Sequence, residues 1–378
     1  MPGRFHFVKV MPETERVKKK RGWGLMFDYL KKLTIAAACA AMAACVTAPD
    51  EELSVQDVAL TQVDVNGVSL RVAEAGPQDG PLVVFVHGWP ELWYSWRYQI
   101  PALAEAGYHV IAPDMRGYGG SDAPEAVEAY DIHQLTADIA GLVDHYGYED
   151  AAIVGHDWGA IVSWYSVLLH PEKFNSLVAM SVPYNPRGPV SPIEAMQRGY
   201  GDNFFYILYF QEPGAAEAEF DANPRGILQR LYASPDTPRM PPEITDPLRA
   251  AGGWIPRFGE PTELPDWLSE DDLQYYVDSF SESGFRGGIN YYRNFHRNWE
   301  TTEELDGAQI DIPVLFLAGT RDTVIRGATA EQLEAGLSRT AQDLRDVHLI
   351  DGIGHWVQQE AADEVNAQIL DFLADTHD

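Results

Sequence analysis

Cysteine is nearly absent from this 378-residue sequence, which contains only Cys39 and Cys45. Both lie close to the N-terminus, so the rest of the chain cannot form a disulfide, present a thiol nucleophile or bind a metal through cysteine. The sequence also contains neither an HExxH motif nor a Walker A loop. Their absence excludes a zincin-type zinc site and a P-loop nucleotide site.

Basic residues are also scarce, with 27 Lys and Arg against 57 Asp and Glu, a net charge of −30. The first 44 residues hold nine basic and three acidic side chains, which leaves 18 basic and 54 acidic residues in the remainder. The body of the protein therefore carries a net charge of −36. Phosphate groups would be repelled by such a surface, so nucleic acid is excluded as a partner.

The N-terminal segment has the pattern of an export signal. Lys31 and Lys32 precede an apolar run at residues 33–44, which is too short to span a bilayer but suits the core of a signal peptide. We interpret residues 1–48 as a leader of a bacterial envelope protein, with Met26 as a plausible true start. Cys45 resembles a lipobox cysteine, so a lipid anchor would be the one contact with membrane. Ordinary cleavage after Ala44 or Ala48, or an amphipathic leader without cleavage, are the alternatives.

The most informative stretch is the pentapeptide Gly155-His156-Asp157-Trp158-Gly159. An apolar run at 151–154 predicts a buried parallel strand before it, and residues 160–165 predict a helix after it. This is the context of the G-x-S-x-G nucleophile turn, with Asp157 in place of serine. A carboxylate nucleophile forms an alkyl ester, so it requires an electrophilic sp3 carbon. The alternative is a glycine-rich turn in which Asp157 caps the helix.

Strands and helices alternate along the chain. Asn66-Gly67 predicts a hairpin turn between residues 63–65 and 68–72. Helices are predicted over 91–104 and 132–146, and buried strands over 82–86, 109–114, 151–154, 177–182, 313–318 and 346–350. The alternation predicts a mostly parallel sheet with helices on both faces. Together with the nucleophile turn around Asp157, it indicates an α/β-hydrolase fold. We expect core regions at 60–183 and 307–378, separated by an inserted helical lid at 184–306 that is rich in Pro, Gly and aromatics.

An acid and a base follow the nucleophile in the order that this fold requires. Asp322 comes directly after the strand at 313–318, and His355 lies in a glycine loop after the last strand. Asp322 would orient the imidazole, and His355 would activate water. Asp311 and Asp351 are less suitable acids by position. His87 and His156, which neighbour the site, are expected to form structural hydrogen bonds.

At this point the chain resembles the soluble epoxide hydrolases from about residue 60 to its C-terminus. The motifs that carry the resemblance are His87-Gly88-Trp89-Pro90, Arg116-Gly117-Tyr118-Gly119, the pentapeptide around Asp157, Tyr209-Phe210-Gln211-Glu212-Pro213-Gly214 and Gly354-His355-Trp356. The resemblance implies that two lid tyrosines, Tyr206 and Tyr292, donate hydrogen bonds to the epoxide oxygen. Tyr209 and Tyr291 are the fallback candidates if the register differs.

The same resemblance implies an oxyanion hole made by the backbone N–H groups of Trp89 and Trp158, whose side chains would also wall the substrate pocket. No cofactor or metal is required, and the partners are a small epoxide and water. The expected product is a vicinal diol. A haloalkane or haloacetate dehalogenase, which shares the aspartate nucleophile, is the nearest alternative. A catalytically inactive ligand-binding protein with the same fold is the more distant one.

Overall fold

The computed structural model describes residues 54–376. The predicted leader, including Met26 and Cys45, lies outside these residues. Within the described residues no helix is both long enough and apolar enough to cross a membrane.

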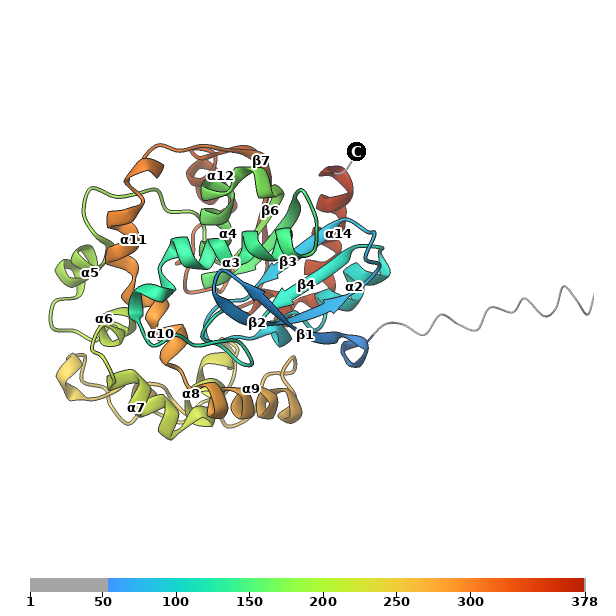
Figure 1. Cartoon of the computed structure of the whole chain (residues 1–378). Coiled ribbons are helices and arrows are strands. Elements are labelled where there is room, and N and C mark those ends of the chain that lie inside the picture. The colour runs from blue at the N-terminus through green and yellow to red at the C-terminus, as the bar shows by residue number, and fades with distance from the viewer. Residues whose placement is uncertain (1–53, 377–378) are drawn as a thin grey trace, which may run out of the picture. The chain divides into compact units, whose positions relative to one another are not determined.

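An eight-stranded sheet with the order β1-β2-β4-β3-β5-β6-β7-β8 forms the core (Figure 1). The hairpin of β1 (Ala59–Val65) and β2 (Val68–Ala75) turns at Asn66 and Gly67, which both have positive φ angles. β1 and β2 are antiparallel to their neighbours, and the other strand pairs are parallel. The remaining strands are β3 (Leu82–Val86), β4 (His109–Pro113), β5 (Ala151–His156), β6 (Phe174–Met180), β7 (Ile310–Gly319) and β8 (Ala341–Ile350).

Alternating side chains of the central strands fill two separate cores. Val84 and Val86 of β3 pack on the side covered by α3 (Ile132–His145), α4 (Trp158–Leu169) and α12 (Ala330–Leu337). Val83 and Phe85 face the opposite side, covered by α2 (Gln99–Glu105), α13 (Val357–Glu360) and α14 (Ala362–Thr376). Because successive residues of a strand point to opposite faces, a strand covered on both sides is apolar throughout. The predicted fold class is confirmed.

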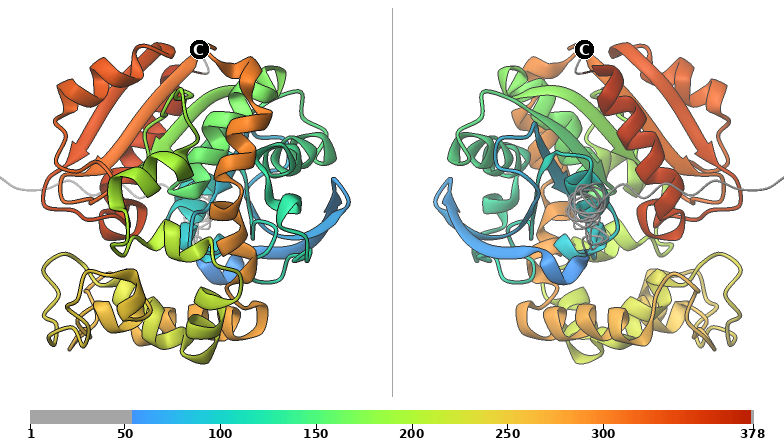
Figure 2. Two further views of the ribbon diagram at one scale, coloured as in Figure 1. Left: turned by 90° about the vertical axis from the view of Figure 1, so that its left-hand side faces the viewer. Right: turned by 90° about the vertical axis from the view of Figure 1, so that its right-hand side faces the viewer.

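A helical region is inserted between β6 and β7. Its helices are α5 (Pro192–Tyr200), α6 (Tyr206–Phe210), α7 (Ala215–Ala222), α8 (Pro224–Tyr232), α9 (Glu270–Ser283), α10 (Arg286–Arg293) and α11 (Phe295–Thr301). In Figure 2 the helices α7 to α9, in yellow and light orange, form a layer below the edge of the sheet. A long loop with two short 3-10 turns, Arg249–Ala251 and Ile255–Arg257, joins α8 to α9.

The single helix predicted over 91–104 is wrong. The segment forms a 3-10 turn at Trp93–Trp96 and then the separate helix α2. Both tryptophans are buried, and the Trp96 ring stacks on Phe85 with 4.7 Å between ring centroids. The packing of these large side chains against β3 therefore determines the local conformation, and the segment does not form the continuous helix that its sequence pattern predicts.

Candidate active site

The turn at Asp157 joins β5 to α4 and holds the residue in a strained conformation, with φ 53° and ψ −117°. A Cβ at Gly159 would lie 1.8 Å from the Val86 carbonyl oxygen, and one at Gly155 would lie 2.3 Å from the Gly159 oxygen. Both positions therefore require glycine. The Asp157 side chain makes no capping hydrogen bond to α4, which removes the helix-cap alternative. Strain of this kind, held by tight packing, is typical of functional residues.

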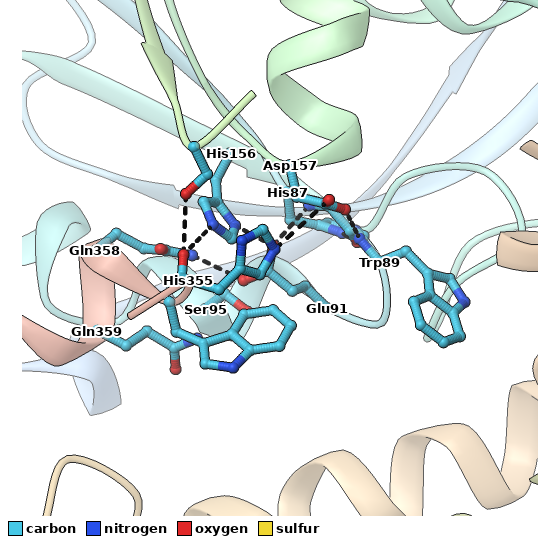
Figure 3. Close-up of polar contacts among 12 residues, drawn as sticks. His87, Trp89, Glu91, Ser95, His156, Asp157, His355, Gln358 and Gln359 are labelled. Carbon is cyan, nitrogen blue, oxygen red and sulfur yellow. Dashed lines mark hydrogen bonds and ion pairs between the residues drawn. The ribbon is translucent and has the colours of Figure 1, made fainter. Parts of the chain in front are cut away.

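The two carboxylate oxygens of Asp157 lie in different surroundings. Oδ1 accepts a hydrogen bond of 2.8 Å from the Trp89 backbone N–H. Oδ2 lies 3.6 Å from Nε2 of His355 (Figure 3). In the described part of the chain the Trp158 amide makes no hydrogen bond to Asp157, so its place in an oxyanion hole stays a prediction. One oxygen is thus held by an amide donor while the other faces the imidazole.

Asp322 and His355 meet as the sequence predicts. His355 Nδ1 lies 3.0 Å from Asp322 Oδ2, and the Asp322 side chain is fully buried. Asp322 Oδ1 accepts a 2.8 Å hydrogen bond from the Val324 amide. Burial disfavours the charged imidazole, but the Asp322 and Asp157 carboxylates outweigh it and raise the pKa of His355 well above its usual value. The fold therefore brings a nucleophile, a base and an orienting acid together, although each came from a different strand end.

Glu91 is a buried carboxylate that the sequence analysis did not identify, and it is connected to His355 through His156. Glu91 is completely buried and accepts hydrogen bonds of 2.8 Å from the Gly88 amide and 2.7 Å from Gln358 Nε2. Glu91 Oε2 also lies 2.7 Å from His156 Nδ1, and His156 Nε2 lies 2.8 Å from the His355 carbonyl oxygen (Figure 3). Both ring nitrogens of His156 face acceptors, so His156 links Glu91 to the backbone of the loop that carries His355.

His87 also has the structural role that the sequence predicts. Its Nε2 accepts a 2.9 Å hydrogen bond from the Met115 amide, so Nδ1 carries the proton and donates to the Gly88 carbonyl oxygen at 2.9 Å. Burial lowers the pKa of His87, which agrees with a neutral ring. The imidazole therefore fixes the loop that carries Trp89.

A cavity of about 460 Å³ opens above Asp157. Tyr206 of α6 and Tyr292 of α10 both line it, with 5.7 Å between their ring centroids. Burial, together with the nearby Asp157 charge, raises the pKa of both phenols above the usual value of 10.0. Two phenols whose raised pKa values keep them protonated thus share a cavity with one carboxylate, so the cavity combines a nucleophile with two proton donors.

The hydroxyl groups of the two fallback tyrosines, Tyr209 and Tyr291, form hydrogen bonds outside the cavity. The Tyr209 hydroxyl donates to Glu219 Oε2 at 2.9 Å, and the Tyr291 hydroxyl donates to the Arg116 carbonyl oxygen at 3.0 Å. Neither residue lines the cavity in the described part of the chain. The register that places Tyr206 and Tyr292 toward Asp157 is therefore the one the fold adopts.

The Trp89 side chain differs from expectation, because it does not line this cavity whereas Trp158 does. Its ring instead stacks on Trp254 from the long lid loop, at 5.8 Å and an interplanar angle of 8°. Trp254 also stacks on Tyr206 at 4.8 Å and 16°. Glu219 holds this loop by accepting hydrogen bonds of 2.9 Å from the amides of Trp254 and Ile255. The Trp89 ring thus packs against Trp254, which in turn packs against Tyr206.

No cluster of three or more His, Cys, Asp or Glu side chains within residues 54–376 has the arrangement of a metal site. What the arrangement can do is nucleophilic catalysis with a carboxylate, a histidine base and phenolic proton donors. The strained turn and the three residues at the carboxyl ends of parallel strands define an enzyme of the α/β-hydrolase class.

Comparison with known proteins narrows this class. Residues 81–362 match the family described as alpha/beta hydrolase fold. The chain is 51% identical to epoxide hydrolase A of Mycobacterium tuberculosis over 315 residues, which is 82% of this chain and 96% of the relative. The crystal structure of epoxide hydrolase A from Mycobacterium thermoresistibile is 50% identical, with a TM-score of 0.76 over 84% of this chain and 98% of that one. An epoxide hydrolase from Vigna radiata is 40% identical, with a TM-score of 0.77 over 85% and 99% of the two chains. The chain belongs to the epoxide hydrolases of the α/β-hydrolase fold.

Proposed function

We propose that this epoxide hydrolase forms vicinal diols in two steps through an alkyl ester of Asp157. The observation that carries the proposal is the asymmetry of the Asp157 carboxylate. Oδ1 is held by the Trp89 amide at 2.8 Å, and Oδ2 is left to attack a substrate in the adjoining cavity. An enzyme of this type would remove reactive epoxides, which is a detoxifying role.

In the first step Asp157 Oδ2 attacks a carbon of the oxirane, and the carbon–oxygen bond of the ring breaks. The departing oxygen takes a proton from Tyr206 or Tyr292. Because burial and the Asp157 charge raise the pKa of both phenols, they remain protonated before the reaction. Attack removes the Asp157 charge and creates an alkoxide, so proton donation becomes favourable at the moment that it is needed.

In the second step His355 removes a proton from water, and the resulting hydroxide attacks the ester carbonyl carbon. Negative charge develops on Oδ1, where the Trp89 amide already donates. Collapse of this intermediate breaks the bond between the carbonyl carbon and Oδ2, and the departing alkoxide takes the proton of the His355 imidazolium to give the diol. The carboxyl proton left on Asp157 passes to the tyrosinate formed in the first step, since these side chains line the same cavity, and the resting enzyme is restored. Asp322, 3.0 Å from Nδ1, stabilises the imidazolium that forms.

A comparison of substrates tests the reaction. Purified enzyme supplied with aryl or short terminal epoxides should form diols, and chloroalkanes of matched size should release no halide. Halide release without diol formation would favour the dehalogenase alternative instead. A mixture in which neither product forms, with a folded protein, would favour the inactive ligand-binding alternative.

Export and lipidation are a separate proposal, which rests on Lys31, Lys32, the apolar run at 33–44 and Cys45. The mature protein would begin at Cys45 and reside at the bacterial cell envelope. Intact-mass analysis of membrane and soluble fractions tests this proposal. A chain that keeps its leader in the cytoplasm would contradict it.

A further inference from the structure

The two lid tyrosines are held in the cavity by different parts of the molecule. Tyr292 belongs to α10, whose backbone packs directly on the core, since a Cβ at Gly287 would lie 2.2 Å from the Gly117 carbonyl oxygen. The Tyr292 ring also meets the ring of Trp158, the first residue of α4, edge to face with 5.1 Å between centroids. The core therefore fixes the position of Tyr292.

Tyr206 has weaker local support. It is the first residue of α6, a helix of five residues whose N-cap, Phe205, makes no side-chain capping hydrogen bond. A helix this short is stable only through packing on other elements. The Phe205 ring stacks on Tyr200 of α5 at 4.0 Å, and the Phe204 ring lies under the Arg257 guanidinium at 4.4 Å. The position of Tyr206 therefore depends on contacts within the lid.

Trp254 connects the Tyr206 ring to the loop that contacts the nucleophile. The indole stacks nearly parallel on Tyr206 at 4.8 Å and on Trp89 at 5.8 Å. The backbone N–H of Trp89 is the group that donates to Asp157 Oδ1. Because stacked rings cannot approach closer than van der Waals contact, the Trp254 indole sets the spacing between the loop at Trp89 and the phenol of Tyr206.

The loop that carries Trp254 is fixed by two charged side chains. Glu219 of α7 accepts hydrogen bonds of 2.9 Å from the amides of Trp254 and Ile255. Arg257 donates to backbone carbonyl oxygens of the same loop, those of Asp246, Leu248, Gly252 and Gly253, at 2.5, 2.6, 3.5 and 3.1 Å. These contacts make the half-buried Trp254 part of a fixed support for the lid.

We infer that Trp254 is a positioning residue for ring opening, because its stacking holds the Tyr206 phenol where it can protonate the departing oxygen. The inference rests on the proposed function, since Tyr206 acts only when Asp157 opens an epoxide. In the described part of the chain Trp254 does not line the cavity, so it contacts neither the substrate nor the reacting atoms. It therefore acts on ring opening through Tyr206, and hydrolysis of the ester by His355 does not depend on it.

A double-mutant cycle tests the inference. Trp254→Leu should slow ester formation about 10-fold in single turnovers and leave ester hydrolysis at the wild-type rate, because a small displacement weakens the donated hydrogen bond. In a Tyr206→Phe background the same substitution should cause little further loss, since the donor is already absent. In a Tyr292→Phe background it should cost at least as much as in the wild type. Trp254→Phe keeps an aromatic ring and should recover most of the rate.

The control is Trp267→Leu, from the same long loop between α8 and α9. The Trp267 indole donates to Ser234 Oγ at 3.1 Å, and its ring packs on Tyr232. This variant should form the ester at close to the wild-type rate. Ester formation at the wild-type rate by Trp254→Leu would overturn the inference. An equal fold-loss with and without the Tyr206 hydroxyl would also overturn it, since it would show that Trp254 supports the lid as a whole.

A second variant gives an answer if Trp254→Leu does not fold. Glu219→Gln keeps every ring but replaces one acceptor oxygen with an NH2 group that faces a backbone amide, so it should loosen the loop. It should slow ester formation in the same Tyr206-dependent way. A folded Glu219→Gln variant that forms the ester at the wild-type rate would overturn the inference and leave the proposed function intact. A folded wild-type enzyme that forms no ester from any epoxide would instead contradict the proposed function itself.

Discussion

His355 Nε2 lies 3.6 Å from Asp157 Oδ2, close enough for charge attraction but beyond normal hydrogen-bond length. The resting enzyme thus places its base beside its nucleophile, and the nucleophile lines the cavity. The Asp157 charge is one of two that raise the pKa of His355. Esterification removes that charge, so formation of the ester lowers the pKa of His355 and favours the neutral imidazole that can accept a proton from water.

This relationship predicts the titration of His355. Asp157→Asn mimics the uncharged ester, so it should lower the pKa of His355 relative to the wild type. NMR titration of the imidazole measures the change. In the wild-type enzyme the rate of ester hydrolysis, followed in single turnovers, should rise with pH through the lower pKa measured in Asp157→Asn. The reason is that only the neutral imidazole accepts a proton from water.

Asp351→Asn is the matched control, because its carboxylate bonds to Thr320 instead of the imidazole. It should leave the His355 titration close to that of the wild type. An identical pKa for His355 in the wild type and in Asp157→Asn would show that the two side chains do not interact electrostatically.

Replacement of the base should separate the two steps. In His355→Gln, ring opening still proceeds because Asp157 and the lid tyrosines remain, but water is no longer activated. The alkyl ester should accumulate, and mass spectrometry of the peptide containing Asp157 should detect one added substrate mass. Steady turnover at the wild-type rate by this variant would exclude His355 as the base.

The lid tyrosines should affect ring opening much more than ester hydrolysis. Tyr206→Phe or Tyr292→Phe leaves one donor and should slow alkylation roughly 10–150-fold, which corresponds to about 1.5–3 kcal/mol for a hydrogen bond to a charged group. The double variant should nearly stop alkylation. Rapid-quench measurement of ester formation and decay separates the steps.

Tyr209→Phe is the control for the lid, since its hydroxyl bonds to Glu219 outside the cavity. It should alkylate at close to the wild-type rate. A double variant of Tyr206 and Tyr292 that alkylates as fast as wild type would reduce both residues to packing roles. The distinction from a dehalogenase would then rest on the relatives alone.

Glu91 should matter for stability as well as for the site. Glu91→Ala leaves His156, the Gly88 amide and Gln358 without their buried acceptor, so the free energy of unfolding should fall by about 3–5 kcal/mol. Denaturant titration measures this loss. The control Glu194→Ala breaks an exposed ion pair and should cost about 1 kcal/mol or less. Equal, small losses in both variants would show that the buried network contributes little.

The sequence predicted the parts of the site that local motifs encode. Asp157 stands in a five-residue turn and Asp322 and His355 follow strands, so their positions follow from strand order in a parallel sheet. Glu91 and Trp254 were not predicted. Their roles arise from contacts with residues far away in the chain, such as Glu91 with Gln358 and Trp254 with Trp89. The same cause, packing of Trp96 on Phe85, overrode the predicted helix at 91–104.

The central claim is that Asp157 attacks the epoxide and that water later attacks Asp157. A single turnover in water enriched in oxygen-18, with enzyme in excess over substrate, tests it most directly. The diol should contain no label from water, because its new oxygen comes from Oδ2, and the peptide containing Asp157 should gain one labelled oxygen. A labelled diol together with an unlabelled Asp157 peptide would show that water attacks the epoxide directly, and would contradict the account.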